Sequence, residues 1–426
     1  MKGVKDILSG FLSRSGSYVF VASMLARLLS FTASWLVLQL VSEQALGSVI
    51  FAFSFIVFLI PIGGFGLEQS YIRYAAVSKD ATEKEQLFRY TFKKGLLLAG
   101  LFSLLLAIIG YLAPFIPDSS RIYFMILSFS LLAHFILGMF QNYYRVKHQN
   151  KRFAYLVISF SVILVVLVGL LSYFYAAMGY SIALVLAPLV AVVFFIPDVI
   201  LKRSRDIKPK MVNFRFWQYG FSASLANVAT QLLFALDLIL IGVLLSNTEA
   251  VTQYKYVSLI PFSLLFLPQV LMTTDFVKIA EQIQHKKVID QYIKNYWSLF
   301  SLISLGIGII GFGFTKNILA LFKPEYSVFV STFRVLIIGV LGILMLRGLF
   351  GNLLSAIGKA SVNLWIALVS LSVNLVSNYY FIPKYGILGA AITSASIMWL
   401  SGIVSWVLFR IFYGKGSLFY NNNTAC

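Results

Sequence analysis

Long apolar runs recur along almost the whole chain, and they constrain its fold more than any other feature. Many are longer than the roughly 18 residues at which a helix can cross the hydrocarbon core of a membrane. A segment in lipid must satisfy its own backbone hydrogen bonds, so only helices or a closed barrel can cross. Barrel strands read as alternating segments of about ten residues, whereas these runs are continuous. With 60% hydrophobic residues in a chain of 426, the sequence predicts an all-α polytopic membrane protein.

We expect about twelve transmembrane helices, each of roughly 20 residues. A further stretch at 275–295 spaces Ile residues among charges and is expected to be a cytoplasmic interfacial helix, for which a packing or linker role is the favoured meaning. The predicted spans are 18–40, 45–67, 95–116, 122–141, 154–173, 177–200, 219–242, 251–273, 296–315, 332–354, 361–381 and 387–410.

The formal net charge of +19 is explained first by membrane topology. Three predicted connections are rich in Lys and Arg: 68–94, 142–153 and 201–216. The alternating connections are nearly free of Lys and Arg, and two short ones, 41–44 and 246–250, hold none. Cytoplasmic loops carry the excess of Lys and Arg, so this bias predicts that both termini lie in the cytoplasm. Anionic lipid headgroups are a second use of the same charge, and no nucleic-acid partner is needed to explain it.

Two weak internal matches predict that the chain contains two copies of one six-helix unit. LVSEQALGSV at 40–49 and LLSNTEAVTQY at 244–254 follow the first and seventh spans, about 204 residues apart. YFYAAMGYSIA at 173–183 and YFIPKYGILGA at 380–390 match at an offset of about 207. Because the two offsets nearly agree and are close to half the length, the matches support each other.

The repeat predicts two lobes with the same orientation in the membrane. The second match pairs Gly179 with Gly386. An even number of spans separates the copies, so an axis along the membrane normal relates them, as in transporters with parallel repeats. We therefore predict an N-terminal lobe at 1–216, which ends in a basic cytoplasmic linker at about 201–216, and a C-terminal lobe at 217–426.

Motifs of a membrane enzyme are missing from the sequence. The three His, which are His134, His148 and His285, do not have the spacing of a zinc-binding HExxH motif. GKA at 358–360 lacks the upstream glycine and the strand of a phosphate-binding loop. The single cysteine, Cys426, provides neither an internal disulfide nor a cysteine metal site. We expect a protein that is not an enzyme and binds no metal, with a membrane glycosyltransferase or polymerase as the less favoured alternative.

Four cations inside predicted spans are the candidates for binding an anionic substrate. They are Arg27 in the first span, Lys255 in the eighth, and Arg334 and Arg347 in the tenth. A central Arg or Lys costs about 2.5–3.5 kcal/mol on insertion scales, so it usually faces a cavity or a partner. Lys255 and Arg334 lie close enough to the outer boundary to snorkel instead. Arg27 and Arg347 are deeper and either line a cavity or pair internally.

Acids are scarcer in the spans, and Asp237 in the seventh is the clear one. It either pairs with one of the Arg residues or binds a coupling cation or proton. A cavity with more cations than acids attracts phosphate or pyrophosphate and repels cationic drugs. Other polar side chains in the spans, among them Asn363, Asn374 and Asn378, are explained mainly by hydrogen bonds between helices.

Three stretches resemble one family of transporters. RLLSFTASWLVLQLVSEQALGSVIFAFSFIVFLIPIGGFGLEQSYIRYAA at 27–76 resembles the opening of the polysaccharide transport family. These proteins are Wzx-type flippases of the multidrug/oligosaccharidyl-lipid/polysaccharide superfamily. WQYGFSASLANVATQLLFALDLILIG at 217–242 resembles their seventh span with its Asp, and 353–395 resembles their tenth-to-twelfth region.

The resemblance implies a two-lobed flippase with twelve helices. Such a protein moves undecaprenyl-pyrophosphate-linked oligosaccharide units, for example O-antigen or capsule repeats, across the bacterial cytoplasmic membrane by alternating access. An ion gradient would drive it, with H⁺ or Na⁺ as the coupling ion and no other cofactor. Arg27 and Lys255 match cations of related lipid flippases and Asp237 fits the seventh-span acid, whereas Arg347 has no such match.

The resemblance also implies a location and partners. We expect a multi-pass protein of the cell inner membrane that contacts its lipid-linked substrate, membrane lipids, and a polysaccharide polymerase with its chain-length machinery. The alternative within the same superfamily is a cation-coupled drug or metabolite exporter.

Overall fold

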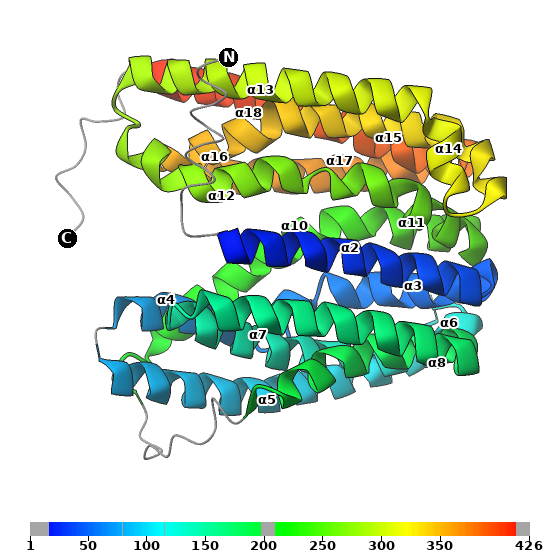
Figure 1. Ribbon diagram of the computed structural model, residues 1–426, viewed down its shortest axis with the longest axis horizontal. Coiled ribbons are helices and arrows are strands. Elements are labelled where there is room, and N and C mark those ends of the chain that lie inside the picture. Colours follow the sequence, from blue (N-terminus) through cyan, green and yellow to red (C-terminus); the bar gives the residue numbers. More distant parts are fainter. Residues whose placement is uncertain (1–16, 79, 115, 197–208, 415–426) are drawn as a thin grey trace. The chain divides into compact units, whose positions relative to one another are not determined.

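The computed structural model describes residues 17–78, 80–114, 116–196 and 209–414, and within these ranges the chain is helical, without strands (Figure 1). Nine of the described helices are long and apolar enough to cross a membrane. A bent pair, Phe214–Ala229 and Gln231–Leu245, raises the number to ten if it is one span. The prediction of an all-α polytopic membrane protein is confirmed.

The chain packs into two compact units that meet in the sequence between Thr252 and Gln253. We call them the N-terminal unit and the C-terminal unit. The elements of the N-terminal unit are α2 (Ser17–Leu40), α3 (Glu43–Val57), η1 (Ile60–Ile62), α4 (Leu67–Val77), α5 (Ala81–Leu112), α6 (Asp118–Ser128), α7 (Ser130–Val146), α8 (Asn150–Val193), α10 (Phe214–Leu245) and the start of α11 (Thr248–Ser263).

The C-terminal unit takes the rest of α11 and the helices that follow it. Its further elements are α12 (Phe266–Glu281), α13 (Lys286–Gly313), α14 (Thr315–Ala320), η2 (Pro324–Phe329), α15 (Val330–Gly342), η3 (Ile343–Arg347), α16 (Gly348–Ala356), α17 (Ala360–Tyr385) and α18 (Ile387–Gly414).

The boundary between the units lies one span after the predicted lobe boundary at 216/217. Helix α10 packs on α3, η1 and α4 and so belongs to the N-terminal unit. Ser70 Oγ on α4 donates to the Phe216 carbonyl on α10 at 2.6 Å. The two six-helix lobes stay a prediction about the repeat. Of the predicted linker at 201–216, residues 201–208 lie outside the described part of the chain.

The expected twelve spans can be followed along the described elements. Helix α8 is 44 residues long and contains Ala176 in a non-helical conformation, with φ 46° and ψ −128°, where two helices meet. The short apolar helix α3 continues through η1, where Pro61 interrupts the helical hydrogen bonds. Counting α8 as two spans and α3 as one, the described helices account for the twelve predicted spans.

The local geometry corrects the register of the second repeat match. In the first copy the chain turns at Ala176, and Gly179 packs against the carbonyl of Leu171. In the second copy it turns at Gly386, and Gly389 packs against the carbonyl of Phe381 in the same way. Gly179 is therefore equivalent to Gly389, and the predicted pairing with Gly386 was wrong. The alignment matched two glycines, whereas the first copy has an alanine at the turn.

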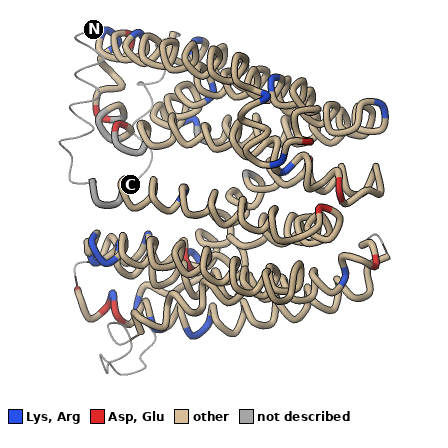
Figure 2. Tube along the Cα trace, turned by 45° about the vertical axis from the view of Figure 1, so that its right-hand side comes forward, with Lys and Arg blue, Asp and Glu red and all other residues tan. Residues whose placement is uncertain are grey.

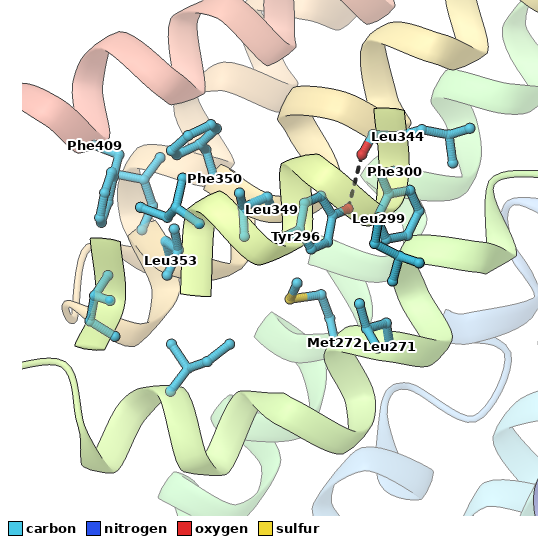
Figure 3. Packing of buried hydrophobic residues seen from close by; sticks show 14 of the residues in the cluster. Leu271, Met272, Tyr296, Leu299, Phe300, Leu344, Leu349, Phe350, Leu353 and Phe409 are labelled. Atoms are coloured by element: carbon cyan, nitrogen blue, oxygen red, sulfur yellow. Dashed lines mark hydrogen bonds between the residues drawn. The ribbon is translucent and has the colours of Figure 1, made fainter. Parts of the chain in front are cut away.

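Buried apolar side chains form the core of the C-terminal unit (Figure 3). Tyr296 and Phe300 on α13 stack with their ring centroids 4.3 Å apart. The stretch predicted as an interfacial helix is instead the end of α12 and the start of α13, which meet at a turn after Glu281. Its Ile residues, including Ile279 and Ile289, are buried in this core because the two helices pack together there.

Charged residues gather toward the ends of the described helices, and the middle of each unit is mostly uncharged (Figure 2). A helix that crosses lipid has this pattern because a charge at its centre is costly. Cations within the apolar segments are therefore exceptions that need a local explanation.

Candidate substrate site

A break in the tenth span positions the one predicted cation that lines a described cavity. The span continues from α15 into a π-helical turn, Ile343–Arg347, and then into α16. A π turn shifts the helical hydrogen bonds and frees carbonyl groups. Tyr296 Oη donates to the Leu344 carbonyl at 2.9 Å (Figure 3). Trp297 Nε1 donates to the Met345 carbonyl at 3.0 Å. Helix α13 thus holds the turn that ends at Arg347.

Arg347 binds polar side chains of the last two helices. Its Nη1 donates to Asn363 Oδ1 at 2.8 Å on α17 and to Ser405 Oγ at 2.6 Å on α18. Ser405 donates its own proton to the Ser401 carbonyl at 2.6 Å, so its oxygen lone pairs face Arg347. Both partners are neutral acceptors, which hold the guanidinium without cancelling its charge.

The Asn363 side chain is itself fixed in the orientation that Arg347 needs. Its Nδ2 donates to the Gly351 carbonyl at 2.7 Å and to Ser355 Oγ at 2.9 Å. With Nδ2 used in this way, Oδ1 points at Arg347. The guanidinium is held by α17 and α18, and its Nε and Nη2 make no hydrogen bond with the described part of the chain.

Arg347 lines a cavity of about 530 Å³ within the C-terminal unit. Helices α12 and α16 approach closely beside it: a Cβ added to Gly348 would lie 2.6 Å from Pro268 Cβ. Cavities of this size hold small ligands or one headgroup of a larger ligand. The wall is apolar apart from Arg347 and three neutral polar residues, and it is lined by Leu265, Pro268, Gln269, Met272, Phe276, Ile343, Arg347, Gly348, Asn352 and Ser355.

The cavity is electropositive because no carboxylate lines it. Within the described ranges, no Asp or Glu lies within ion-pair distance of Arg347. The buried Asp275, also on α12, accepts a hydrogen bond from Tyr292 at 3.1 Å and is not part of the wall. An unpaired guanidinium in an apolar wall favours an anionic ligand such as a phosphate, which it can bind with two parallel hydrogen bonds.

The structure separates Arg347 from the other cations predicted in the C-terminal unit. Arg334 uses its donors at the end of α13, where Nη2 donates to the Phe312 carbonyl at 2.8 Å and Nε donates to Thr315 Oγ1 at 3.3 Å. Cations near a helix C-terminus stabilise it. Lys255, on α11, is half-buried, and its ammonium makes no ion pair among the described residues. Neither residue lines the cavity of Arg347.

The two remaining predicted residues lie in the N-terminal unit. Arg27 is exposed on α2. Asp237 is 1% exposed and lies in the second half of α10. Neither residue is in the lining of the Arg347 cavity, and the roles of Arg27 and Asp237 stay predictions.

Sequence reasoning missed an acid at membrane depth in the N-terminal unit. Glu68 falls in the connection predicted at 68–94, but it lies in the first turn of α4, which packs on α7. A Cβ added to Gly138, which lies within a predicted span, would be 2.6 Å from Glu68 Oε2. The glycine-rich stretch after Pro61 could have indicated this position. Such a stretch allows the second span to break and to continue as a further helix, which includes Glu68.

Sequence reasoning also missed the partners of Arg347. Asn363 was noted only as a polar residue between helices, and Ser405 was not singled out. Both lie far from Arg347 in the sequence, so no local spacing connects them.

Comparisons with known proteins agree with the fold. Over residues 12–258, which are more than half of the chain, the sequence matches the family model of polysaccharide biosynthesis proteins. A 94-residue stretch is 34% identical to an uncharacterized membrane protein of Methanocaldococcus jannaschii. That match covers 21% of this chain and only 18% of the relative.

Solved structures of one superfamily share the fold at low sequence identity. An inward-facing multidrug resistance MATE family transporter of the MOP superfamily has a TM-score of 0.75 at 13% identity, over 91% of this chain and 95% of that one. The lipid II flippase MurJ in an inward closed conformation has a TM-score of 0.72 at 17% identity, over 93% and 87%. A MOP superfamily transporter from Pyrococcus furiosus, described as having a binding pocket of reverse polarity, has a TM-score of 0.67 at 15% identity, over 97% and 98%.

The family match extends from the first span into the eighth. The transporter covers 91% of this chain and the flippase 93%, so both share its fold over most of its length. The chain belongs to the polysaccharide biosynthesis protein family and has the fold of the MOP superfamily.

Proposed function

We propose that the chain is a flippase for undecaprenyl-pyrophosphate-linked oligosaccharide units, such as O-antigen or capsule repeats. The observation that carries the proposal is the cavity of Arg347, which presents a guanidinium held by neutral partners and has no acid in its wall. A pyrophosphate offers the oxygens that such a guanidinium binds best. Membership of the polysaccharide biosynthesis family supports a saccharide as the rest of the substrate.

In this proposal the headgroup binds at Arg347 and the protein alternates between openings to the two sides of the bacterial inner membrane. Both termini lie in the cytoplasm because the basic connections do. The driving force is a gradient of H⁺ or Na⁺, with Asp237 as the candidate coupling residue. The released unit passes to a polysaccharide polymerase with its chain-length machinery. The protein performs no covalent chemistry on its substrate and is not an enzyme.

A drug exporter of the same superfamily would need a cavity of the opposite charge. Cationic drugs would need an acid in its wall, and no carboxylate lines it among the described residues. The polarity of the cavity therefore favours an anionic substrate over a cationic one.

Deletion of the gene in its own host tests the proposal. We expect lipid-linked single units to accumulate on the cytoplasmic face of the inner membrane and surface polysaccharide to fall. The face is measured by the access of a sugar-oxidising reagent in spheroplasts and in inverted vesicles. Accumulation on the periplasmic face would instead indicate a polymerase, and unchanged polysaccharide with greater drug sensitivity would indicate an exporter.

Variants of two Arg residues connect the phenotype to the cavity. Arg347→Ala is expected to restore less than about a tenth of the flipped units, because a charged hydrogen-bond donor is lost. Arg347→Lys keeps the charge without the paired donors and is expected to restore an intermediate amount. Arg410→Ala removes an exposed cation of α18 and serves as the matched control. Full complementation by Arg347→Ala, at normal protein levels, would contradict the assignment of this cavity.

A further inference from the structure

A second cavity, of about 360 Å³, lies within the N-terminal unit where two broken spans meet. Pro61 lines it from the break in the second span, and Gln231 lines it from α10, whose two halves are bent by 44° at that point. The lining comes from four further elements, α2, α3, α7 and α8, and is mostly apolar. It consists of Ser30, Phe53, Val57, Ile60, Pro61, His134, Phe160, Leu164, Leu184 and Gln231.

His134 is the one titratable side chain in this lining. Its Nδ1 lies 2.9 Å from the Ser130 carbonyl, and only a protonated Nδ1 can donate to that oxygen. The neutral ring therefore carries its proton on Nδ1 and has a lone pair on Nε2. Its ring lies edge to face with Phe160, at 6.4 Å between centroids. Nε2 has no hydrogen-bond partner among the described residues.

Helix α7 runs along the break of the second span and packs tightly against it. A Cβ added to Gly63 would lie 3.3 Å from the Leu131 carbonyl, and Gly64 leaves room for the Phe135 ring. One turn beyond His134, at Gly138, the Glu68 carboxylate covers the glycine. Glu68 makes no hydrogen bond or ion pair with the described part of the chain. The acid and the imidazole thus lie on one face of α7, at the two ends of the break.

Two prolines leave carbonyl groups of the lining residues Val57 and Leu184 without their regular helical donors. Pro61 has no N–H for the carbonyl of Val57, and Pro188 has none for the carbonyl of Leu184. Val57 and Leu184 both line the cavity with His134. A neutral Nε2 is an acceptor and gains nothing from a carbonyl oxygen, whereas a protonated Nε2 is a donor that such an oxygen can accept from.

The other charged groups around the cavity lie farther along its walls. Arg27 is one turn before Ser30 on α2, and Asp237 is about two turns after Gln231 on α10. Glu68 on α4 is the acid that faces α7. The lining residues of α3, η1 and α8 are apolar, and α5 approaches this part of α7 with Gly95 against Phe135.

We propose that His134 is a proton-binding site whose occupancy controls the break in the second span. A proton from one side of the membrane binds Nε2, which then donates to a carbonyl at the break and gains the attraction of Glu68. Release of the proton to the other side returns Nε2 to an acceptor and loosens the break. The role of the site in coupling rests on the proposed function, because it names H⁺ as the coupling ion. Proton binding to His134 can be measured without any substrate.

Nuclear magnetic resonance of a single-histidine protein tests the site. His148→Asn and His285→Asn remove the other two imidazoles, and the full chain in detergent is labelled with ¹⁵N-histidine. The nitrogen shifts are expected to show the Nδ1–H tautomer at high pH and protonation of Nε2 on acidification. A ring that stays neutral down to pH 4, or one protonated on Nε2 alone at high pH, would overturn the proposal.

Variants show whether the break and the acid take part. Glu68→Gln and Pro61→Ala are each expected to weaken proton binding about tenfold, since the first removes a negative charge and the second returns an N–H to the Val57 carbonyl. Pro383→Ala, in α17 of the C-terminal unit, is the matched control and is expected to leave the titration unchanged. Circular dichroism and gel filtration confirm folding. Equal titrations in all three variants would contradict the proposal.

The two proposals fail separately. If His134 titrates as expected but gene deletion does not change the level of lipid-linked units on either face, the proton site is supported and the proposed substrate is wrong. If deletion traps the units but His134 does not titrate, the flippase stands and its coupling site lies elsewhere.

Discussion

Thr248 Oγ1 donates a hydrogen bond to the main-chain carbonyl of Gln44 at 3.0 Å, and these residues are 204 positions apart. That separation equals the offset between the two predicted copies of the repeat. Thr252 Oγ1 similarly donates to the Glu43 carbonyl at 2.7 Å. The start of α3 therefore contacts the start of α11, and the sequence predicts these two segments to be equivalent parts of the repeat.

Gly47 makes this close approach possible, and its substitution is expected to destabilise the protein. A Cβ at Gly47 would collide with the carbonyl oxygen of Thr248. Gly47→Val is therefore expected to lower the free energy of unfolding by about 1–3 kcal/mol or more through overpacking. Thermal unfolding in detergent, followed by tryptophan fluorescence, measures the effect. Gly169→Val is the control, because open space surrounds Gly169. If Gly47→Val and Gly169→Val have equal melting temperatures, α3 and α11 do not approach each other closely at Gly47.

Tyr296→Phe is expected to loosen the π turn that carries Arg347. The variant removes the donor to the Leu344 carbonyl and keeps the ring that stacks on Phe300. Loss of one buried hydrogen bond costs about 0.5–1.5 kcal/mol. Hydrogen exchange of residues 343–347 is expected to accelerate. Tyr379→Phe alters an exposed tyrosine of α17 and should leave that exchange unchanged. Protection of the turn as in the native chain would refute a supporting role for Tyr296.

Gln269→Glu places a carboxylate in the cavity of Arg347 with almost no change in shape. The added charge opposes binding of an anion, and we expect the yield of flipped units to fall about tenfold. Gln269→Ala, which adds no charge, is expected to retain most of the activity. Gln291→Glu makes the same chemical change on the exposed side of α13 and is the second control. If Gln269→Glu and Gln291→Glu give equal yields of flipped units, the positive potential of the cavity does not select the substrate.

Arg27→Ala is expected to reduce transport far more than Arg27→Lys, with normal membrane insertion of both proteins. A cation in the middle of a span is costly in free energy and therefore usually has a function, such as binding a substrate. The prediction for Arg27 follows from this rule. The yield of flipped units in the complemented deletion strain measures it, and fractionation shows the membrane level. Full complementation by Arg27→Ala would show that its charge is not needed.

Asp237→Asn tests the coupling role predicted for this acid. The buried carboxylate is replaced by an amide of the same shape, so folding should be retained while ion binding is lost. Transport is expected to stop responding to imposed gradients of H⁺ or Na⁺. His134→Gln is the parallel variant for the proton site. A native gradient response in Asp237→Asn would exclude the role.

Much of the fold follows from the sequence because membrane insertion depends on local composition. Apolar length alone predicts the spans, and even the interrupted ones, α3 with η1 and the two halves of α8, lie at their predicted places. The register of the second repeat match was wrong because Ala176 occupies the turn where the second copy has Gly386. Single-residue matches cannot detect an equivalence of backbone conformation.

The sequence by itself determined that this is an all-helical membrane protein. It also determined that Arg347 lies deep within a span, where a cation is costly and is expected to have a function. Only the tertiary structure decided what surrounds that residue. Asn363, Ser405 and the apolar wall come from other helices, and their proximity depends on how the helices pack. In the same way, Glu68 and His134 became neighbours of one break only when α4 was folded against α7. Periodicity and composition are properties of one segment at a time, whereas the charge balance of a cavity is a property of several.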